Sequence, residues 1–336
     1  MRLGPRGFGR WTEEGQVEVQ LAAPSRACEP VAERDFGPML KLIARRVLAA
    51  LGLSVLLGAP AEALAPNVAR PALWEISDPD TTIYLFGTIH LLPDSLQWRT
   101  EKFDQAVASA QQLVVETIVD QQNLQSIQAA EFKLGFRQGL PPIAQRIPAA
   151  KIPLLRATIA KSGVPEKMFD QMETWLAAIQ LLSLQFKDMG LKGSHGPEEI
   201  LRQQFLATHR PIGELESNIE QFGYFDHLPE KAQRELLEGA IEPPKGLHED
   251  FGEMLSGWSK GDIKQIAVTF NRELAQSPEL KQSLLIERNA NWAKWIEQRM
   301  GQPGTIMVAV GAGHLAGKES VLELLKQSGY MVRRLQ

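Results

Sequence analysis

Two histidines of this 336-residue chain follow a glycine by three positions at the end of an apolar run. Residues Ile83–His90 read Ile-Tyr-Leu-Phe-Gly-Thr-Ile-His, and residues Ile306–His314 read Ile-Met-Val-Ala-Val-Gly-Ala-Gly-His. Apolar, β-prone runs of this length predict buried strands. Because the chain has only six histidines, the repeated pattern favours a common site for His90 and His314.

Two more predicted strands end on glutamate. Leu113–Val115 leads into Glu116, and the predicted strand Arg210–Glu216 ends on Glu216, with Glu214 nearby. Ligands of open α/β sheets bind beyond the carboxyl ends of the strands. If the four strands are neighbours, two imidazoles and two carboxylates meet in one pocket. That set suits a divalent Zn, Mn or Co ion with an open position for water. Such an ion supplies hydroxide and polarises a carbonyl, as hydrolysis requires.

Each of these residues also has a simpler structural interpretation. A single histidine after a strand is commonly held by hydrogen bonds without a chemical role, and a strand-end glutamate is commonly solvated or caps a helix. The pairing of two Gly-x-x-His units is what favours function here. The loop histidine His195 could close over a pocket, although a solvated loop explains it as well, and no role is assigned to His209, His227 or His248.

Arg288 is a further candidate. The helix predicted after Pro278 carries one row of residues at 3-4-3 spacing, namely Leu285, Arg288, Trp292 and Trp295. A face with two tryptophans is expected to pack inward, and a buried guanidinium needs a carboxylate partner. The alternative is that the arginine extends to the surface. We expect Arg288 to orient Glu116 or Glu216, or to stabilise a developing oxyanion.

A dinucleotide site is a competing interpretation of the second motif. Gly311–Gly317 reads Gly-Ala-Gly-His-Leu-Ala-Gly between a predicted strand and a helix, and Arg333 and Arg334 follow. A doubly wound domain needs several more strands after its first glycine turn. The sequence ends at Gln336, so this interpretation is disfavoured.

The N-terminal residues predict a secretory signal. Segment 39–65 has basic residues, then the largely apolar run Val47–Gly58, then the small residues of Ala59–Ala65. The run is too short to span a bilayer comfortably, so no stable membrane span is expected after cleavage. Residues 1–38 are expected to be a non-native or disordered extension. The only cysteine, Cys28, lies there, so disulfides are not expected in the mature domain, which we expect to be periplasmic or secreted.

Composition and patterning predict one α/β domain over residues 66–336. The chain is 44% hydrophobic and 23% charged, with a net charge of −4 and no basic block, so nucleic acid is not an expected partner. Residues 73–76 and 83–86 predict a hairpin, and Thr100 is expected to cap a helix. We expect a mixed central sheet with flanking helices.

A large helical insertion is expected between about residues 121 and 207. One of its helices is expected to start at Gly163–Glu166 and to carry five apolar residues on one face: Phe169, Met172, Trp175, Leu176 and Ile179. Further helices are expected from Pro197, from about Pro229, after Pro243–Pro244 and Asp262, and from Pro278 to about Met300. A helix over 318–327 and a strand over Tyr330–Leu335 are expected to close the domain.

The residues from about 70 onward resemble the TraB/GumN family, which includes the Tiki-like membrane proteases of animals. The matching pieces are Trp74–Ile76, Tyr84–His90, Val114–Glu116, Gly213–Glu216 with Gln221, Arg288–Asn289 with Trp292, and Val310–Leu315. The resemblance implies an erythromycin-esterase-like or ChaN-like fold and a metal-dependent peptidase that uses Mn or Co. It places the metal ligands at His90, His314, Glu116 and Glu216. Two stretches depart from the family: Gly196–Glu198 stands for Gly-Val-Asp, and Glu173–Trp175 stands for Lys-Pro-Trp.

These observations predict a metal-dependent hydrolase acting on a peptide or a small-molecule ester. His90 and His314 would bind the metal, Glu116 or Glu216 would be a ligand or the general base, and Arg288 would give electrostatic support. Two alternatives stay open: a metal-independent, esterase-like hydrolase with histidine as general base, and a non-catalytic periplasmic protein that binds a ligand through the same residues.

Overall fold

The computed structural model describes residues 68–89, 92–93, 96–119, 124–188, 196–242, 247–274 and 277–336. All of them belong to one compact unit. The predicted extension and signal peptide, and the histidines His90 and His195, lie outside the described residues. Among the residues that are described, no helix has the length and apolar character needed to cross a membrane.

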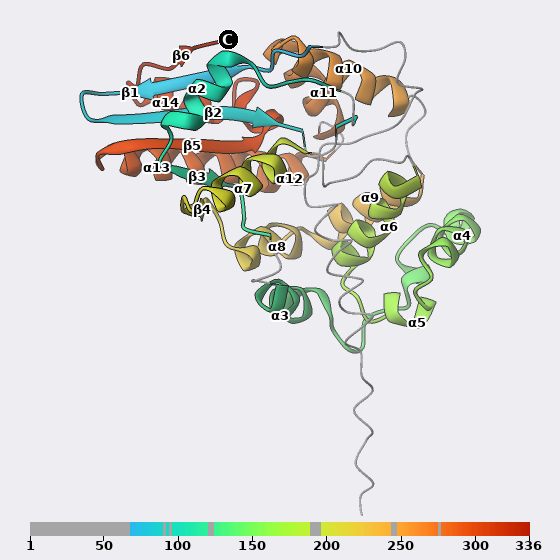
Figure 1. Ribbon diagram of the computed structural model, residues 1–336. Coiled ribbons are helices and arrows are strands. Elements are labelled where there is room, and N and C mark those ends of the chain that lie inside the picture. The colour runs from blue at the N-terminus through green and yellow to red at the C-terminus, as the bar shows by residue number, and fades with distance from the viewer. Residues whose placement is uncertain are drawn as a thin grey trace, which may run out of the picture. The chain divides into compact units, whose positions relative to one another are not determined.

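A six-stranded mixed sheet forms the centre of the fold, as the sequence predicted, with strand order β4-β3-β5-β2-β1-β6 (Figure 1). The strands are β1 (Leu73–Ser77), β2 (Thr81–Thr88), β3 (Gln112–Val115), β4 (Ile212–Glu214), β5 (Gly304–Gly311) and β6 (Arg333–Arg334). The pairs β4–β3, β3–β5 and β5–β2 are parallel, and β1 is antiparallel to β2 and β6. The carboxyl ends of the four parallel strands therefore meet at one edge.

The two strands that lead into the Gly-x-x-His units are neighbours. Strand β2 pairs with β5 from Thr81 opposite Gly304 through to Thr88 opposite Gly311. The predicted β1–β2 hairpin is also present, and its turn is closed by Asp78, whose Oδ1 accepts the Thr81 N–H at 2.7 Å. The side-by-side arrangement of these two strands is thus a property of the sheet itself.

Helices cover both faces of the sheet. One face packs in a core with α2 (Glu101–Ser109), α7 (Pro197–Ala207), α10 (Leu247–Ser259) and α11 (Ile263–Leu274). The other packs against α13 (Arg288–Met300) and α14 (Val321–Gln327). Met307 and Ala309 of β5 belong to the first core, whereas Val308 and Val310 belong to the second, as the two-residue period of a strand requires.

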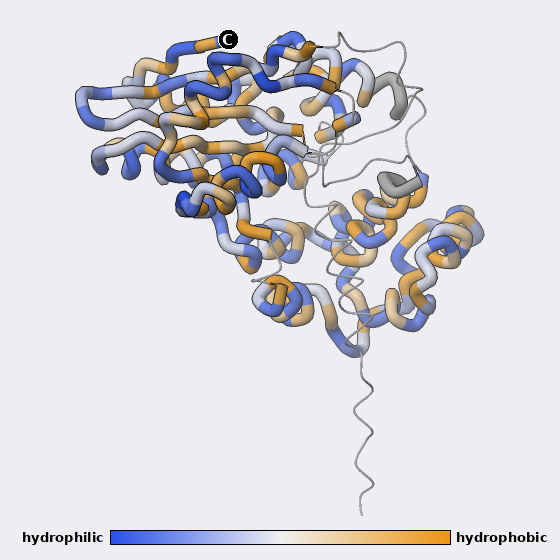
Figure 2. The backbone as a smooth tube through the Cα atoms, in the orientation of Figure 1, coloured by the Kyte–Doolittle hydropathy of each residue, from blue (hydrophilic) through white to orange (hydrophobic). Residues whose placement is uncertain are grey.

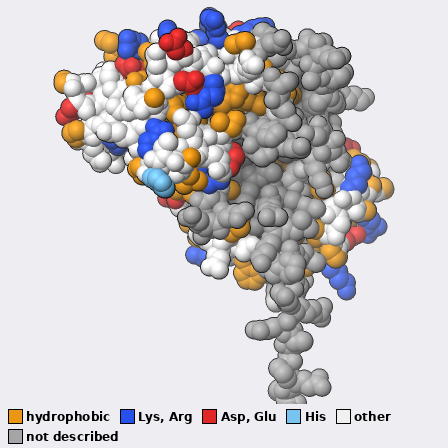
Figure 3. All heavy atoms as spheres, viewed as in Figure 1, with side chains coloured by type: hydrophobic (Ala, Val, Ile, Leu, Met, Phe, Trp, Pro, Cys, Tyr) orange, Lys and Arg blue, Asp and Glu red, His pale blue; other side chains and the backbone are white. Residues whose placement is uncertain are grey.

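Helices of the predicted insertion share a core that differs from its predicted bounds. This core joins α3 (Leu124–Gly135), α4 (Ile152–Ser162), α5 (Glu166–Phe169) and α6 (Thr174–Asp188) to two helices beyond residue 207, α8 (Asn218–Asp226) and α9 (Glu230–Ile241), with short 3-10 turns at Ile143–Gln145 and Ala149–Lys151. Helix α7, which lies within the predicted bounds, packs in the core of the sheet instead. Figure 2 shows hydrophobic and hydrophilic residues along each of these helices, as amphipathic helices have. In Figure 3, charges of both signs are scattered over the visible face of the sheet-bearing part.

One predicted helix is interrupted. Its five apolar residues are buried, but α5 ends at Phe169 and α6 begins at Thr174. The reason is Arg146, which donates to the carbonyls of Asp170 and Met172 at 2.9 and 2.5 Å. Because these carbonyls are bound by a distant side chain, they are not available to continue the helix.

Other boundaries also differ from the prediction. The strand predicted over Arg210–Glu216 is confined to β4, and only Arg333–Arg334 of the last predicted strand is paired. Helix α14 starts at Val321 because Ser320 caps it. The long helix after Pro278 has three parts: α12 (Pro278–Lys281), the π-helical turn η4 (Gln282–Glu287) and α13.

Candidate functional site

Three of the four predicted strand-end residues meet at the carboxyl edge of the sheet. Glu116 directly follows β3, Glu216 lies two residues beyond β4, and His314 lies in the 3-10 turn η5 (Ala312–Leu315) after β5. The Glu216 N–H donates to the Glu116 carbonyl at 3.0 Å, which holds the two glutamates side by side. The fourth residue, His90, is outside the described residues.

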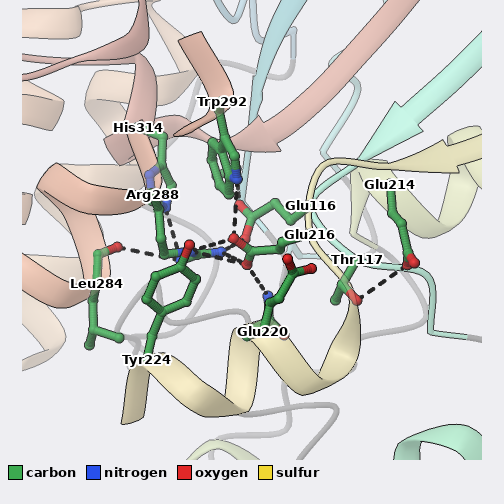
Figure 4. Close-up of polar contacts among 12 residues, drawn as sticks. Glu116, Thr117, Glu214, Glu216, Glu220, Tyr224, Leu284, Arg288, Trp292 and His314 are labelled. Carbon is green, nitrogen blue, oxygen red and sulfur yellow. Dashed lines mark hydrogen bonds and ion pairs between the residues drawn. The ribbon is translucent and has the colours of Figure 1, made fainter. Parts of the chain in front are cut away.

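Arg288 lies between the two carboxylates (Figure 4). Its Nη2 donates to Glu116 Oε2 and to Glu216 Oε1, both at 2.6 Å. Its Nε lies 3.1 Å from each oxygen of Glu216. The helix pattern predicted an inward arginine with a carboxylate partner, and the structure gives it two.

The three charged side chains are almost completely buried, with exposed fractions of 9% for Arg288, 11% for Glu116 and 3% for Glu216. Burial alone would lower the pKa of Arg288, but Glu116 and Glu216 outweigh it and raise that pKa, so the guanidinium stays charged. Burial raises the pKa of Glu216, and Arg288 opposes that rise. Buried charges of this kind are tolerated only when they are closely paired.

Further donors fix the two carboxylates. Trp292 Nε1 donates to Glu216 Oε2 at 3.1 Å, and Gln221 Nε2 donates to Glu216 Oε1 at 3.0 Å. The Gly311 N–H donates to Glu116 Oε1 at 2.7 Å. Both oxygens of Glu216 are therefore covered by N–H donors from three different side chains.

The π-helical turn η4 positions Arg288 at its end. Arg288 is the first residue of α13, and its Nη1 lies 3.4 Å from the Leu284 carbonyl within η4. The guanidinium carbon lies 4.7 Å from the centre of the Trp292 ring and 5.9 Å from that of Tyr224. π-helical turns are frequent at functional sites, and this one places a cation against two aromatic faces.

His314 is held in one tautomer. Asn289 Nδ2 donates to the Glu319 carbonyl at 2.7 Å, so its Oδ1 is directed at His314 Nδ1, also at 2.7 Å. Nδ1 must therefore carry the hydrogen, which leaves Nε2 as an acceptor. Arg288 Nη1 lies 3.3 Å from that Nε2. The ring also packs against Trp292, with centres 4.4 Å apart.

The two motif glycines serve close packing. Gly87 lies inside β2, and a Cβ there would be 3.0 Å from the Ala312 Cα. Gly311 ends β5 with an ordinary φ of −51°. A Cβ on Gly311 would be 3.2 Å from Glu116 Oε1 and 3.6 Å from His314 Cδ2. Glycine therefore leaves room for the carboxylate and the imidazole.

Two residues acquire a place at this edge that sequence reasoning did not give them. Asn289 orients His314, and Glu198 at the start of α7 accepts a hydrogen bond from Thr88 Oγ1 at the end of β2. The sequence signalled Glu198 as part of a helix start and as the end of a stretch, Gly196–Glu198, that departs from the family pattern. By contrast, His209 and His227 are exposed and lie outside the cluster.

The predicted metal ligands fit a metal ion unequally. His314 Nε2 fits, because a metal-bound histidine commonly donates its other N–H to a carbonyl oxygen. Glu216 does not fit a metal ion, because N–H donors bind both of its oxygens. Glu116 does not fit either, because it is bound to the same guanidinium. Among the side chains that the structure describes, no three of His, Cys, Asp and Glu form a metal-binding group.

Comparison with known proteins gives a family. The model of the TraB/PrgY/gumN family matches residues 72–334. The uncharacterized protein YbaP of Escherichia coli (strain K12) is 25% identical over 243 residues, which cover 72% of this chain and 87% of YbaP. An uncharacterized protein of Treponema pallidum (strain Nichols) is 22% identical over 269 residues, covering 76% of this chain and 80% of that protein. No solved structure matches.

Proposed function

The chain belongs to the TraB/PrgY/gumN family, and on that premise we propose that it is a metal-dependent hydrolase, with peptides as the first substrate class and small esters as the second. The observation that carries the proposal is His314. Its Nδ1 is bound to Asn289 Oδ1, and its acceptor Nε2 lies beside the Arg288 cation at the carboxyl edge of the sheet.

Each residue of the cluster has a task in this proposal. Asn289 selects the Nδ1–H tautomer of the neutral His314 ring, in which Nε2 can bind a metal or a proton. Glu116 and Glu216 hold the guanidinium through Nη2 and Nε. Nη1 makes only the longer contacts of 3.3 and 3.4 Å, so it is the part of Arg288 that can stabilise a negative oxygen of the substrate.

A divalent Mn, Co or Zn ion would be held by His314 together with His90, and when bound it would lower the pKa of a water molecule and polarise a carbonyl group. The glutamates paired with Arg288 are retained as support for the cation and not as ligands. The proposed ligand set is therefore smaller than the one expected from the sequence, because Glu116 and Glu216 are no longer ligands. Arg288 lies next to their carboxylates, where an ion would have to bind.

The test is metal content together with turnover. The protein is purified after brief exposure to Mn, Co or Zn, and bound metal is measured in the parent, His90→Ala, His314→Ala and the exposed control His227→Ala. We expect the first two variants to lose the metal and hydrolysis of a peptide and ester panel, and the control to retain both. Parent-like metal content in His90→Ala and His314→Ala would remove the metal from the proposal.

A metal-free hydrolase is the second candidate, and the pairing of both glutamates with Arg288 favours it. In that case His314 Nε2 is the general base. Hydrolysis that persists after dialysis against a strong chelator selects this candidate, whereas hydrolysis restored only by added metal selects the first. Ligand binding without turnover over the whole panel would instead select a binding protein.

The proposed location is the periplasm or the outside of the cell. It rests on the signal-like segment 39–65, which lies outside the described residues. N-terminal sequencing of the protein recovered from the periplasm or the medium tests it. A mature start between about residues 62 and 66 is expected, because the small residues of Ala59–Ala65 suit signal cleavage.

A further inference from the structure

Tyr224 carries a hydrogen-bond donor next to the cation of the site. The tyrosine lies on α8, and the guanidinium carbon of Arg288 is 5.9 Å from the centre of its ring. Figure 4 shows the ring beside the guanidinium. The Tyr224 side chain is only partly buried, so part of it is in contact with solvent. The proposed hydrolysis leaves this side chain without a task.

Asn291 fixes the direction of the Tyr224 hydroxyl. The Asn291 side chain donates from Nδ2 to the hydroxyl oxygen at 3.1 Å. Asn291 is exposed and lies three residues after Arg288, so α13 supplies both the cation and the group that orients the phenol. Among the residues that the structure describes, this is the one hydrogen bond of the hydroxyl, and the oxygen is the acceptor in it. The hydroxyl hydrogen is therefore left for a substrate acceptor.

The backbone that carries Tyr224 is held on two sides. Ser283 of η4 donates its Oγ hydrogen to the Tyr224 carbonyl at 2.7 Å. One turn earlier on α8, Gln221 donates to Glu216, and a capping box closes the first turn of the helix. The phenol is thus fixed in position before a substrate arrives, and a preorganised donor loses little freedom on binding.

The phenol keeps its proton near neutral pH. Burial raises the pKa of Tyr224 above its ordinary value of about 10, and Glu216 adds to that rise, while Asn291 and Arg288 oppose it. A neutral phenol donates a hydrogen bond, whereas a phenolate only accepts one. Tyr224 therefore recognises an acceptor such as a carbonyl oxygen.

The distance from Arg288 suits a second carbonyl of the substrate. In the proposed hydrolysis the scissile carbonyl binds beside Arg288 Nη1 and His314 Nε2, which are 3.3 Å apart. Consecutive Cα atoms of a peptide are about 3.8 Å apart, so the next peptide group lies one such step from the scissile one. The Tyr224 ring, centred 5.9 Å from the guanidinium carbon, is within reach of that group. A peptide has a carbonyl there, whereas a simple ester has none.

We propose that Tyr224 selects peptides over small esters by donating its hydroxyl hydrogen to the substrate carbonyl next to the scissile bond; this rests on the proposed hydrolase function. That carbonyl does not react, so the contact is the same in the bound substrate and in the transition state. An interaction of this kind lowers KM and leaves kcat unchanged.

The test uses the full chain, a capped peptide, and an alkyl ester whose sole carbonyl is the scissile one. Tyr224→Phe keeps the ring over Arg288 and removes the donor. We expect KM for the peptide to rise about 3- to 10-fold, with kcat and the melting temperature unchanged, and both constants for the ester to keep their parental values. Tyr330→Phe is the matched control, because Tyr330 is also partly buried but packs in the core beside α13 and α14.

A second variant separates the donor from the packing of the ring. Asn291→Ala leaves the Tyr224 hydroxyl free to rotate, so we expect a smaller rise in KM for the peptide. Combined with Tyr224→Phe, it should add nothing, because residues that act through one hydrogen bond have non-additive effects. A loss that Asn291→Ala adds in full to that of Tyr224→Phe would show that Asn291 does not act through the phenol, and the orienting role would be wrong.

The outcomes separate this inference from the hydrolase function. If the parent hydrolyses the peptide and Tyr224→Phe keeps the parental KM for it, the hydroxyl does not bind the substrate, and the hydrolase function stands. If Tyr224→Phe raises KM equally for both substrates, the residue does not select peptides, and the inference is wrong. A parent that hydrolyses only the ester overturns the selection but not the hydrolase. If neither substrate is hydrolysed, the hydrolase function fails, and the role of Tyr224 is overturned with it.

Discussion

The protein buries ionisable side chains in two regions and treats them differently. At the sheet edge, Arg288 is paired with Glu116 and Glu216 at 2.6 Å. In the helical insertion, Glu131 of α3 is fully buried, and neither of its carboxyl oxygens has a hydrogen-bond partner. Burial raises the pKa of Glu131 to about 8, so this carboxyl is neutral at pH 7.

The difference shows two ways in which a folded chain tolerates a buried acid. Charge is kept where a guanidinium and several N–H groups stabilise it, and it is given up where the surroundings are apolar, because an unpaired buried charge is far more costly than a neutral carboxyl. Fixed charge at the sheet edge is what a catalytic site requires. No comparable need is visible around Glu131.

The largest expected effect is at the paired region. Arg288→Met leaves two buried carboxylates next to each other without a cation, so we expect the free energy of unfolding to fall by about 3–5 kcal/mol. Urea unfolding at pH 7 measures it. Lys294→Met, at an exposed position of the same helix, is the control and should change stability by less than about 0.5 kcal/mol. Equal losses in the two variants would mean that the pairing is not what stabilises this region.

In the unpaired region, removing the ionisable group should raise the free energy of unfolding, whereas at the sheet edge it lowers it. The pKa of Glu131 is higher in the folded protein than in the unfolded chain, so the folded state holds more protons between pH 4.5 and about 8, and stability must fall as the pH rises through that range. We expect Glu131 to lower the free energy of unfolding of the parent by about 3 kcal/mol as the pH rises from 5 to 8.

Glu131→Gln should remove that part of the pH dependence, as urea unfolding at pH 5 and pH 8 would show. The variant should therefore gain stability relative to the parent as the pH rises. Glu101→Gln, at an exposed position of α2, should leave the pH dependence as it is. A variant that follows the parental curve at both pH values would show that Glu131 is ionised, and therefore paired, in the folded protein.

Local sequence patterns predicted much of the sheet edge, but they did not predict which carboxylates pair with Arg288. The apolar runs before Glu116 and His314 and the 3-4-3 spacing around Arg288 are local features, so strand ends and an inward arginine followed from them. Which carboxylates face Arg288 depends on strand order: β3 and β4 are neighbours although Glu116 and Glu216 are 100 positions apart, and no periodicity encodes that. The two glutamates were therefore expected to bind a metal.

The other differences between the predicted and the observed structure also depend on contacts that local sequence patterns do not encode. Glu198 is bound at the sheet edge by Thr88, 110 positions earlier in the chain. The break between α5 and α6 depends on Arg146, whose guanidinium binds carbonyls 24 and 26 positions away. Glu131 shares a helix face with Ile127 and Ala130, but a single acid in an amphipathic pattern reads as a surface residue until the packing of α3 is known.

A smaller effect is expected where one neutral donor to the paired region is removed. Trp292→Phe keeps most of the ring but loses the Nε1–H that Glu216 Oε2 accepts at 3.1 Å. Hydrogen bonds to charged groups contribute more than neutral ones, so we expect a loss of about 1–2 kcal/mol by urea unfolding. Trp295→Phe on the same helix is the matched control because Trp295 is only partly buried. A larger loss in Trp295→Phe would show that ring packing outweighs the bond to Glu216.

The smallest effect is expected at Gln221, because this residue combines both situations in one side chain. Its Nε2 donates to Glu216 Oε1 at 3.0 Å, whereas its Oε1 is buried without a partner. Gln221→Leu removes a favourable bond to a charge and an unfavourable unpaired oxygen together, so the two changes should offset each other to within about 1 kcal/mol. Urea unfolding of Gln221→Leu and Trp292→Phe side by side tests this expectation. If Gln221→Leu loses as much free energy of unfolding as Trp292→Phe, the unpaired oxygen costs nothing in the parent. Burial without a partner would then be penalised only for groups that can ionise, such as Glu131.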